Sequence, residues 1–407
     1  MDWITTFNAL KSVYIDEAFS NIAINEAIEQ HPGCSTGFVR TFTKGVIRDT
    51  IKLDYYINRL AARGIKGIKK RTLIILRMGI YAIESLDSVP EHAACNEAVK
   101  LARKVSKGSD GFVNGILRNF IRQRDNLSVE HNFEQGSDEY LSINYSFPID
   151  LVRLIRDQYD SETESLLDAL NRPTALVLRP NRLKVKASKP IIADGGNYVG
   201  TEEFRAGHYS VQSLSSIEAI EHFAPQSGSS VLDMCAAPGG KSCAMAEIMG
   251  NKGSITACDV YDHRLDLIKA QAKRLGITII KTELMDGTLF NSELENSFDY
   301  VLADVPCSGL GVIPSKPEIK FRTQVSDYDE LTEIQYKILR NAVNYVRDGG
   351  YIEYSTCTIN KNENDKVVES LLKECKLVHV LEKNSILPYN NKVGFYYCIM
   401  QKTPVCR

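Results

Sequence analysis

From about residue 211 to the C-terminus, short apolar runs alternate with longer stretches of mixed polar and apolar residues. The runs SSVLDMC, SITACDV and FDYVLADVP are examples, and a segment with helical periodicity follows each of them. Apolar strands separated by helices form a parallel sheet that is covered on both faces. The pattern therefore predicts an α/β fold for this half of the chain, with the strands in its interior.

The first part of the chain, to about residue 127, has the periodicity of helices instead. Apolar residues recur at spacings of three and four in RTLIILRMGIYAIES, which includes Leu76 and Ile80, and in FVNGILRNFIRQR, which includes Phe112 and Ile116. This spacing gives each helix an apolar stripe, and helices with such stripes pack as a bundle. We expect an all-α domain over 1–127, with the apolar stripes facing its core.

The segment between those two parts changes in composition along its length. Residues 126–145 are rich in Asn, Ser, Gly and acids, which is typical of a linker. Beyond Pro148 the sequence predicts one or two helices, followed by a strand in PTALVLRPNRLKV. We therefore expect a small connecting α/β domain over 128–206 and the larger α/β domain over 207–407.

Composition excludes several classes of protein. The 407 residues are 43% hydrophobic and 25% charged, which is typical of a globular protein. No run approaches the ~18 apolar residues of a membrane span, and the start, MDWITTFNAL, lacks the basic and apolar blocks of a signal peptide. The ten cysteines form no C-x-x-C pair and show no zinc-finger spacing with histidine. We expect a cytoplasmic protein with no membrane segment and no metal.

The net charge of −2 conceals a basic region near the N-terminus. Residues 1–130 hold 19 Lys and Arg against 14 Asp and Glu, and 61–77 carries six cations and no acid. A local cluster of cations attracts a polyanion regardless of the charge of the whole chain. The stretch 61–77 is therefore a candidate for contact with nucleic acid, and the alternative is a solvated helix face.

Four acids follow successive predicted strands of the α/β domain. They are Asp233, Asp259, Asp286 and Asp304. The first is followed by MCAAPGGKS, a turn whose glycines and small residues let the backbone approach a ligand at the start of a helix. Asp259 lies 20 residues beyond Gly239, where an acid can accept hydrogen bonds from a ribose. The turn matches neither the P-loop pattern nor G-x-G-x-x-G, so the sequence predicts a pocket for another nucleotide-like cofactor.

Two cysteines follow neighbouring strands of the same predicted sheet. Cys307 lies in DVPCSG after the fourth strand, and Cys357 lies in YSTCT after the fifth. Adjacent parallel strands would bring both thiols to the same edge, beside the pocket. A thiolate is a strong nucleophile when nearby positive charge, such as that of Lys241, activates it. A single cysteine is more often an inert core residue, but this pair is a candidate reactive site.

These segments resemble those of a known family. VLDMCAAPGGKS, DVPCSGLG and YSTCT are similar to the signatures of S-adenosylmethionine-dependent RNA 5-methylcytosine methyltransferases, and VGFYYCIMQK resembles their last strand. PEHAACNEAVKLAR and GFVNGILRNF resemble the NusB-like RNA-binding domain, and YSFPIDLVRLIRDQY resembles the connecting domain of the RsmB (Sun/Fmu) subfamily. The chain thus resembles, over nearly its whole length, the RsmB family of 16S rRNA cytosine-C5 methyltransferases.

The resemblance implies a fold, a reaction and a set of roles. It implies a class I methyltransferase domain, whose mostly parallel seven-stranded sheet has one antiparallel strand near the C-terminus. It implies that Cys357 adds to carbon 6 of cytosine and that Cys307 assists release of the RNA, with Lys241 and Asp304 near the reacting base. Asp259 would bind the ribose of S-adenosylmethionine, and Asp286 would lie near its adenine. The implied cofactor-binding residues are Cys235, Ala236, Ala237, Pro238, Gly239, Gly240, Lys241, Asp259, Arg264, Asp286 and Asp304.

The implied partner is 16S rRNA, before the ribosomal subunit is fully assembled. Three positions depart from the family pattern: Ser213 replaces an acid, Pro314-Ser315-Lys316 contains one cation where two are usual, and Phe321 replaces Trp. These departures concern contacts with RNA more than methyl transfer. Two alternatives stay open, namely a non-catalytic NusB-like RNA-binding factor and a 5-methylcytosine methyltransferase that acts on tRNA.

Overall fold

The computed structural model describes residues 1–187, 189–193, 198–322 and 324–404. Contacts divide the chain into two compact units. The helical unit comprises residues 1–172 together with 313–325, and the sheet unit comprises 173–312 and 326–407. The three-domain division predicted from the sequence stays a prediction. In the part of the chain that the structure describes, no helix is both long enough and apolar enough to span a membrane.

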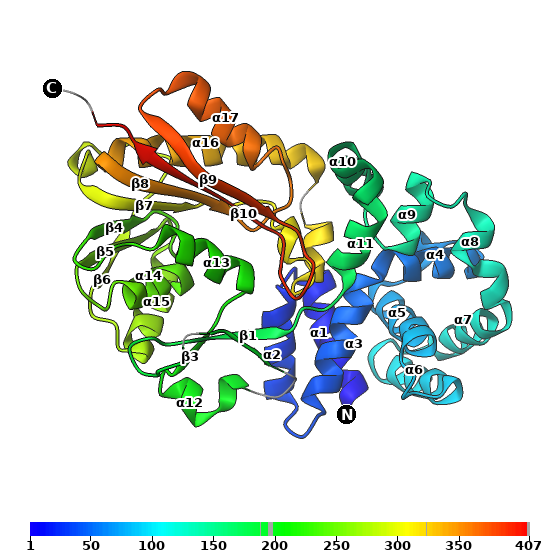
Figure 1. The fold of residues 1–407 in the computed structure, drawn as a ribbon. Helices are drawn as coiled ribbons and strands as arrows, with labels where there is room; N and C mark the ends of the chain where they lie inside the picture. The colour runs from blue at the N-terminus through cyan, green and yellow to red at the C-terminus, as the bar shows by residue number, and fades with distance from the viewer. Residues whose placement is uncertain (188, 194–197, 323, 405–407) are drawn as a thin grey trace. The chain divides into compact units, whose positions relative to one another are not determined.

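The helical unit contains only helices as regular structure among its described residues, and those before residue 172 are drawn from blue to green in Figure 1. The α-helices are α1 Asp2–Ile15, α2 Ser20–Gln30, α3 Thr36–Arg48, α4 Thr50–Leu60, α5 Lys70–Ser85, α6 Glu91–Val105, α7 Asp110–Gln123, α8 Val129–Asn132, α9 Asp138–Asn144, α10 Ile149–Tyr159 and α11 Thr163–Asn171. Short 3₁₀ helices are η1 Ile65–Gly67, η2 Arg124–Leu127, η3 Asp160–Glu162 and η7 Pro317–Phe321.

Packing in this unit explains its sequence and corrects two expectations. Phe42 is buried and stacks on Tyr81 at 5.9 Å between ring centroids, and Gly45 lies so close to the Tyr81 ring that no side chain fits there. The prediction of an all-α domain is confirmed. Phe112 is 43% exposed, however, because only one side of α7 faces the core. The predicted linker 126–145 is also wrong, since α8 and α9 form there and bury apolar side chains.

The segment 313–325 is held in the helical unit by two buried charged side chains. Glu318 accepts a hydrogen bond from the backbone N–H of Ser20 at 2.9 Å. The ammonium of Lys320 donates to the carbonyl of Ser146 at 3.1 Å and to Oδ1 of Asn171 at 2.6 Å. Burial lowers the pKa of Lys320 well below its usual range. Its partners lie at the C-terminal ends of helices, where the peptide dipoles favour a cation.

The sheet unit is built on a seven-stranded sheet of order β6-β5-β4-β7-β8-β10-β9. The strands are β4 Ser230–Asp233, β5 Ser254–Asp259, β6 Ile280–Leu284, β7 Phe298–Asp304, β8 Val346–Thr356, β9 Val378–Ile386 and β10 Phe395–Lys402. β10 runs antiparallel to both of its neighbours, and β4, β5, β6, β7 and β8 pair in parallel. The predicted fold class is confirmed.

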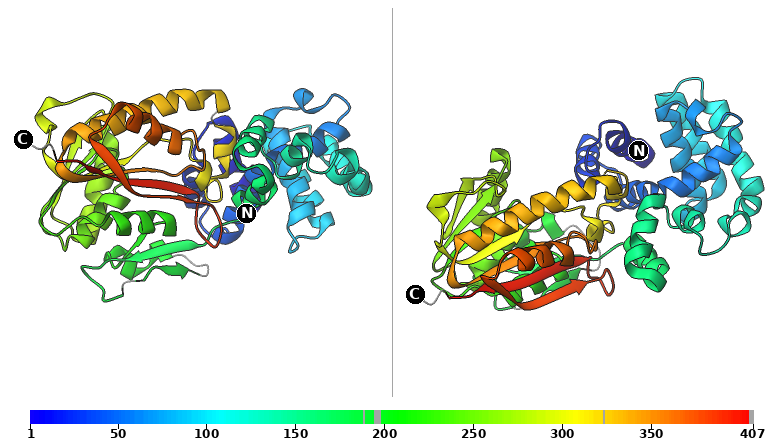
Figure 2. Two further views of the ribbon diagram at one scale, coloured as in Figure 1. Left: turned by 45° about the horizontal axis from the view of Figure 1, so that its top comes forward. Right: turned by 90° about the horizontal axis from the view of Figure 1, so that it is seen from above.

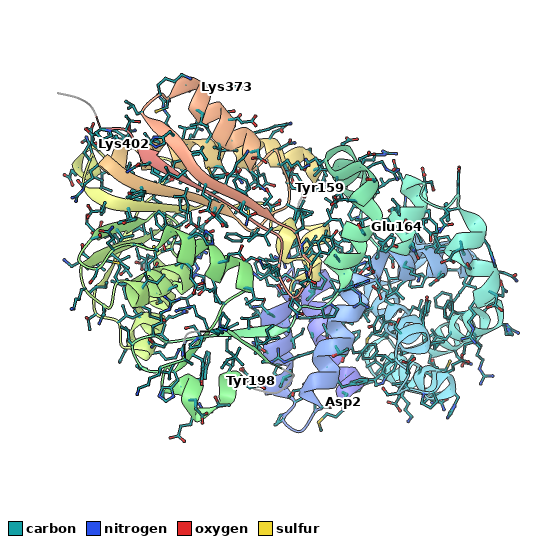
Figure 3. All side chains as sticks on the ribbon, viewed as in Figure 1. Asp2, Tyr159, Glu164, Tyr198, Lys373 and Lys402 are labelled. Atoms are coloured by element: carbon teal, nitrogen blue, oxygen red, sulfur yellow. The ribbon has the colours of Figure 1, made fainter. Side chains whose placement is uncertain are left out.

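Lys402, labelled in Figure 3, is a buried cation at the end of β10. Its ammonium donates to the backbone carbonyls of Val343 and Val346.

Helices cover both faces of this sheet (Figure 2). They are α13 Leu214–Phe223, α14 Gly240–Ile248, α15 Asp262–Leu275, α16 Tyr328–Tyr345 and α17 Asp365–Glu374, with α12 Glu202–Arg205 outside the sheet region. One apolar cluster packs α16 and α17 on one face, and a second packs α13, α14 and α15 on the other. Short 3₁₀ helices are η4 Tyr198–Gly200, η5 Ser292–Leu294, η6 Leu310–Val312 and η8 Val325–Asp327.

A small antiparallel sheet of order β2-β1-β3 precedes α13. Its strands are β1 Leu176–Pro180, β2 Ile191–Ala193 and β3 Tyr209–Val211. The guanidinium of Arg179 in β1 forms a buried ion pair with Glu247 of α14, which joins the small sheet to the larger one. Ser213, which replaces a family acid, accepts from the Ser216 backbone N–H and caps α13. Ser and Asp are both good caps, so this departure preserves the start of the helix.

Candidate active site

The site lies where the strand order of the large sheet changes direction. β4 pairs with β5 on one side and with β7 on the other. In open α/β sheets, ligands bind beyond the carboxyl ends of the strands at such a point. Asp233, Asp259 and Asp304 end β4, β5 and β7, and Asp286 follows the end of β6 by two residues. The structure therefore places all four predicted acids at the same edge.

The turn between β4 and α14 requires glycine at one position and leaves open space at the next. Gly239 has a φ of +100°, and a Cβ there would lie 3.2 Å from the Cα of Ile268. Beside Gly240 a Cβ would meet no atom within 4 Å. No side chain caps α14, so the first N–H groups of this helix can donate to a ligand.

Arg264 joins two segments of the predicted cofactor site. Its guanidinium pairs with the Asp259 carboxylate at 3.2 Å and donates to the carbonyl of Ala237 at 3.2 Å. Asp259 is buried and also accepts from the Tyr261 backbone N–H. Asp286 is exposed, and its carboxylate accepts from both the N–H and the hydroxyl of Thr288. Both acids are thus held in place before any ligand binds.

Lys241 and Asp304 form an ion pair beside this turn. The Nζ of Lys241 lies 2.6 Å from Oδ2 of Asp304, and the Ser355 hydroxyl donates to Oδ1 of Asp304 at 3.1 Å. Lys241 also lies over the Phe395 ring at 5.1 Å. Burial acts to lower the pKa of Lys241, but the attraction of Asp304 outweighs it and the pKa is raised. Lys241 is therefore a fixed positive charge at this edge.

The two cysteines meet at the ends of β7 and β8. Their Sγ atoms lie 3.3 Å apart, and both side chains are partly exposed. The contact with Cys357, together with burial, raises the pKa of Cys307 well above its usual range. Cys307 therefore stays a thiol and can donate its proton towards Cys357, while the cation of Lys241 interacts with Cys357. The sequence prediction that these thiols share an edge is confirmed.

Two buried carboxyl groups lie near Lys241: Asp233, which is one of the four predicted acids, and Glu353, which is not among the predicted residues. Burial raises the pKa of Asp233 to about 7. The hydrogen bond that the Ser242 hydroxyl donates to it, at 2.5 Å, acts in the opposite direction and lowers the pKa, but its effect is smaller. Glu353 of β8 is 0% exposed, neither of its oxygens has a hydrogen-bond partner, and burial raises its pKa to about 8. The sequence signal for Glu353 is a single acid within the apolar run of a central strand.

Glu353→Gln should make the chain more stable at alkaline pH. The folded protein holds a proton on Glu353 that the unfolded chain releases above pH ~4.5, so the free energy of unfolding falls as the pH rises towards 8. The neutral amide lacks this dependence. From pH 5 to pH 8 the difference in free energy of unfolding between the variant and the parent should grow by on the order of 3 kcal/mol in favour of the variant.

Chemical denaturation followed by circular dichroism measures this difference. The single tryptophan, Trp3, lies in the helical unit and would not report on the sheet. Glu333→Gln, at an exposed position of α16, is the matched control and should track the parent at both pH values. A difference that stays constant between pH 5 and pH 8 would show that Glu353 is ionised in the folded protein.

The donor set of this edge fits S-adenosylmethionine. Asp259 offers a carboxylate to ribose hydroxyls, the start of α14 offers N–H groups to a carboxylate, and the open space beside Gly240 admits a ligand close to the backbone. When bound, this cofactor supplies a methyl group on a positively charged sulfur. Among the residues that the structure describes, no cluster of three or more His, Cys, Asp and Glu side chains could hold a metal ion.

Part of the basic stretch 61–77 lines a pocket on the helical unit. Lys69, Lys70 and Arg71 border a pocket of about 360 Å³ together with Lys107. Arg77, at the end of the stretch, is instead paired with Asp54 through two hydrogen bonds of 2.7 and 2.6 Å and is mostly buried. Arg77 therefore has a structural role, and the cations of the pocket stay candidates for contact with nucleic acid, as do the exposed Arg63 and Lys66 of the same stretch.

Solved structures share this architecture. The crystal structure of PH0851 is 22% identical, covers 98% of this chain and 98% of its own, and has a TM-score of 0.80. The crystal structure of a methyltransferase homologue from Pyrococcus horikoshii is also 22% identical, with a TM-score of 0.59, and covers 66% of this chain and all of its own. These likenesses support the fold of the chain.

Family models and a curated relative identify the chain. The model of the 16S rRNA methyltransferase RsmB/F matches residues 220–403, and that of the NusB family matches 4–122. The fold and site are therefore those of an S-adenosylmethionine-dependent methyltransferase joined to a NusB-type helical domain. The probable ribosomal RNA small subunit methyltransferase B of Bacillus subtilis (strain 168) is 34% identical over 393 residues, which are 90% of this chain and 87% of the relative. The chain belongs to the ribosomal RNA small subunit methyltransferase B family.

Proposed function

We propose that this protein methylates carbon 5 of one cytosine in 16S rRNA, in the cytoplasm and before the ribosomal subunit is fully assembled. The observation that carries the proposal is the pair of thiols, 3.3 Å apart, beside the Lys241–Asp304 ion pair. Methylation of an exocyclic nitrogen needs no cysteine, whereas carbon 5 of cytosine is too weak a nucleophile to react without covalent activation. Two thiols at this edge therefore favour the carbon.

In the proposed mechanism, the Cys357 thiolate adds to carbon 6 of the base, and the new C–S bond makes carbon 5 electron-rich. Asp304 stabilises a proton at N3 of the cytosine as negative charge develops on the ring. Carbon 5 would then take the methyl group of S-adenosylmethionine, and the electron pair of the broken methyl–sulfur bond would stay on the sulfur. A base next removes the proton from carbon 5, the C–S bond breaks, and its electron pair returns to Cys357. Cys307, which stays protonated, is placed to assist this last step.

The target base must leave its stack to reach the thiols. The reacting groups come from strand ends, turns and a helix start, and both cysteines are only partly exposed. A cytosine in a loop, or one flipped out of a helix, can enter such a site at the smallest cost in lost stacking. We propose that the helical unit holds the surrounding RNA through the basic pocket on its surface.

Bisulfite sequencing of ribosomal and transfer RNA, from cells with and without this protein, tests the proposal. We expect one cytosine of 16S rRNA to lose its mark when the protein is absent. Loss of a mark in tRNA instead would support the proposed reaction but would show that the substrate is tRNA and not 16S rRNA. No lost mark in either RNA, together with retained RNA binding, would favour a non-catalytic RNA-binding factor.

Replacing Lys69, Lys70 and Arg71 by alanine should weaken RNA binding and reduce its dependence on salt. Each cation that contacts a phosphate releases a counterion, so the loss of three contacts should flatten the slope of log K against log salt by about 2. Fluorescence anisotropy with a 16S rRNA fragment, at several salt concentrations, measures the slope.

The matched control removes three exposed cations from the same unit. Lys100, Arg103 and Arg124 are each paired with an acid, so their replacement by alanine should change the slope little. An unchanged slope in the first variant would show that Lys69, Lys70 and Arg71 form a solvated face.

A further inference from the structure

A buried carboxylate behind the two cysteines is not used by the mechanism above. Glu363 precedes α17, is 0% exposed and accepts four hydrogen bonds. Its Oε2 accepts from the Ser308 backbone N–H at 2.7 Å and from the Gln335 side chain at 3.0 Å. Its Oε1 accepts from the Ser308 hydroxyl at 2.5 Å and from the Asn360 amide at 2.9 Å. Both oxygens are thus satisfied, as the burial of a carboxylate requires.

Donors to Glu363 hold the chain on both sides of Cys307. Ser308 is the next residue and donates twice. Gln335, buried in α16, donates to Glu363 and also to the carbonyl of Pro306, the preceding residue, at 2.9 Å. The backbone that carries Cys307 is therefore fixed before and after the thiol, and Glu363 is the acceptor that both attachments share.

The Cys357 segment is attached to the same group through other contacts. The hydroxyls of Ser308 and Thr358 lie 2.8 Å apart, and the Asn360 backbone N–H donates to the Thr358 hydroxyl at 3.1 Å. Tyr354 of β8 donates to the backbone carbonyl of Glu363 at 2.5 Å. Cys357, however, directly follows β8, whose pairing with β7 fixes it without the carboxylate. Cys307 lies three residues beyond the end of β7 and has no such support.

We propose that Glu363 is a positioning residue that holds the Cys307 segment, and so sets the distance between the two thiols. The charge of the carboxylate raises the pKa of the Cys307 thiol, and this effect is separate from its hydrogen bonds to Ser308 and Gln335. The carboxylate positions Cys307 through Ser308 and Gln335, and its removal should displace Cys307 more than Cys357. The expected effect on RNA release rests on the proposed function, whereas the position of Cys307 does not depend on it.

Glu363→Gln tests the placement because it keeps the size of the side chain and replaces one acceptor oxygen by a donor. One of the two oxygens becomes an NH₂ group, so the donors that faced that oxygen lose their acceptor. Ser308 is affected in either case, because its N–H faces one oxygen and its hydroxyl faces the other. Limited alkylation of the free protein with iodoacetamide, followed by mass spectrometry of the two cysteine peptides, measures each thiol separately. We expect the rate at Cys307 to rise about ten-fold or more, as for a thiol released from a buried contact, and the rate at Cys357 to change much less.

Turnover with labelled 16S rRNA gives the second readout. Misplacing a catalytic group by about 1 Å can cost a hundred-fold in rate, so Glu363→Gln should lower turnover by about that factor. RNA-linked protein should accumulate on a denaturing gel, as expected for Cys307→Ala. If Cys307→Ala gives no linked band while Glu363→Gln still changes alkylation at Cys307 alone, the proposed role of Cys307 fails and the positioning role stands.

Two further variants separate positioning from folding. Gln335→Met removes the link to Pro306 with little change in size and should reproduce both effects, even if Glu363→Gln does not fold. Glu374→Gln, at the far end of α17, is the matched control and should behave as the parent. Equal alkylation rates at Cys307 in the parent, Glu363→Gln and Gln335→Met would overturn the inference. Equal acceleration at both cysteines would also overturn it, because that is the result of a general loosening.

Discussion

Cys357→Ala is expected to abolish methyl transfer, with a loss of at least about a thousand-fold in turnover, because carbon 5 of cytosine is not activated without the C–S bond at carbon 6. Affinity for S-adenosylmethionine should be nearly unchanged, since the predicted cofactor residues follow or end β4, β5, β6 and β7, whereas Cys357 follows β8. Transfer of a labelled methyl group to 16S rRNA, with calorimetry for cofactor binding, measures both quantities.

The control for this variant is Cys375→Ala, at a partly buried cysteine that follows α17 and lies outside the site. It should keep the activity of the parent. Methylation that survives in Cys357→Ala would refute the assignment of the nucleophile. If activity were lost together with cofactor binding, the variant would report on the integrity of the pocket rather than on the thiol.

Cys307→Ala should give the opposite kind of defect, in which the chemistry begins but does not finish. The Cys357 thiolate remains and can add to carbon 6, but the thiol that lies 3.3 Å from it is missing when the C–S bond must break. We expect roughly one reaction per protein molecule and a protein–RNA band that survives denaturation. A gel with labelled RNA, run with and without S-adenosylmethionine, measures the band.

The double variant Cys307→Ala/Cys357→Ala is the control, because the band depends on the remaining thiol. It should give no linked RNA. If Cys307→Ala turns over normally and leaves the RNA unlinked, Cys307 has no role in release. A band that persists in the double variant would point to a different attachment site.

The sheet and its functional edge could be predicted from sequence because both depend on local patterns. Apolar runs between helices predicted a mostly parallel sheet, and acids or cysteines placed directly after those runs had to lie at its carboxyl edge. The pairing of Asp304 with Lys241, and the contact between Cys307 and Cys357, follow from strand order once β4, β7 and β8 are neighbours.

Features that depend on contacts between distant segments could not be predicted in this way. Glu363 stands in a polar run, NKNENDK, and nothing in that run indicates that Ser308 and Gln335 would bury its carboxylate. The stretch 126–145 looked like a linker because its composition is polar, yet Tyr140 and Leu141 find apolar neighbours and helices form around them. Burial, rather than composition, decides such cases.

The segment around Lys320 also bears on how proteins of this architecture can be rearranged by recombination. The chain leaves the helical unit after Arg172, returns to it at Ile313 and leaves it again after Val325. A fragment that begins after Arg172 would therefore keep the segment 313–325 but lack its partners. Glu318 would lose the N–H of Ser20, and Lys320 would lose the carbonyl of Ser146 and the side chain of Asn171. We therefore expect that an exchange of the helical unit would have to replace this internal segment at the same time.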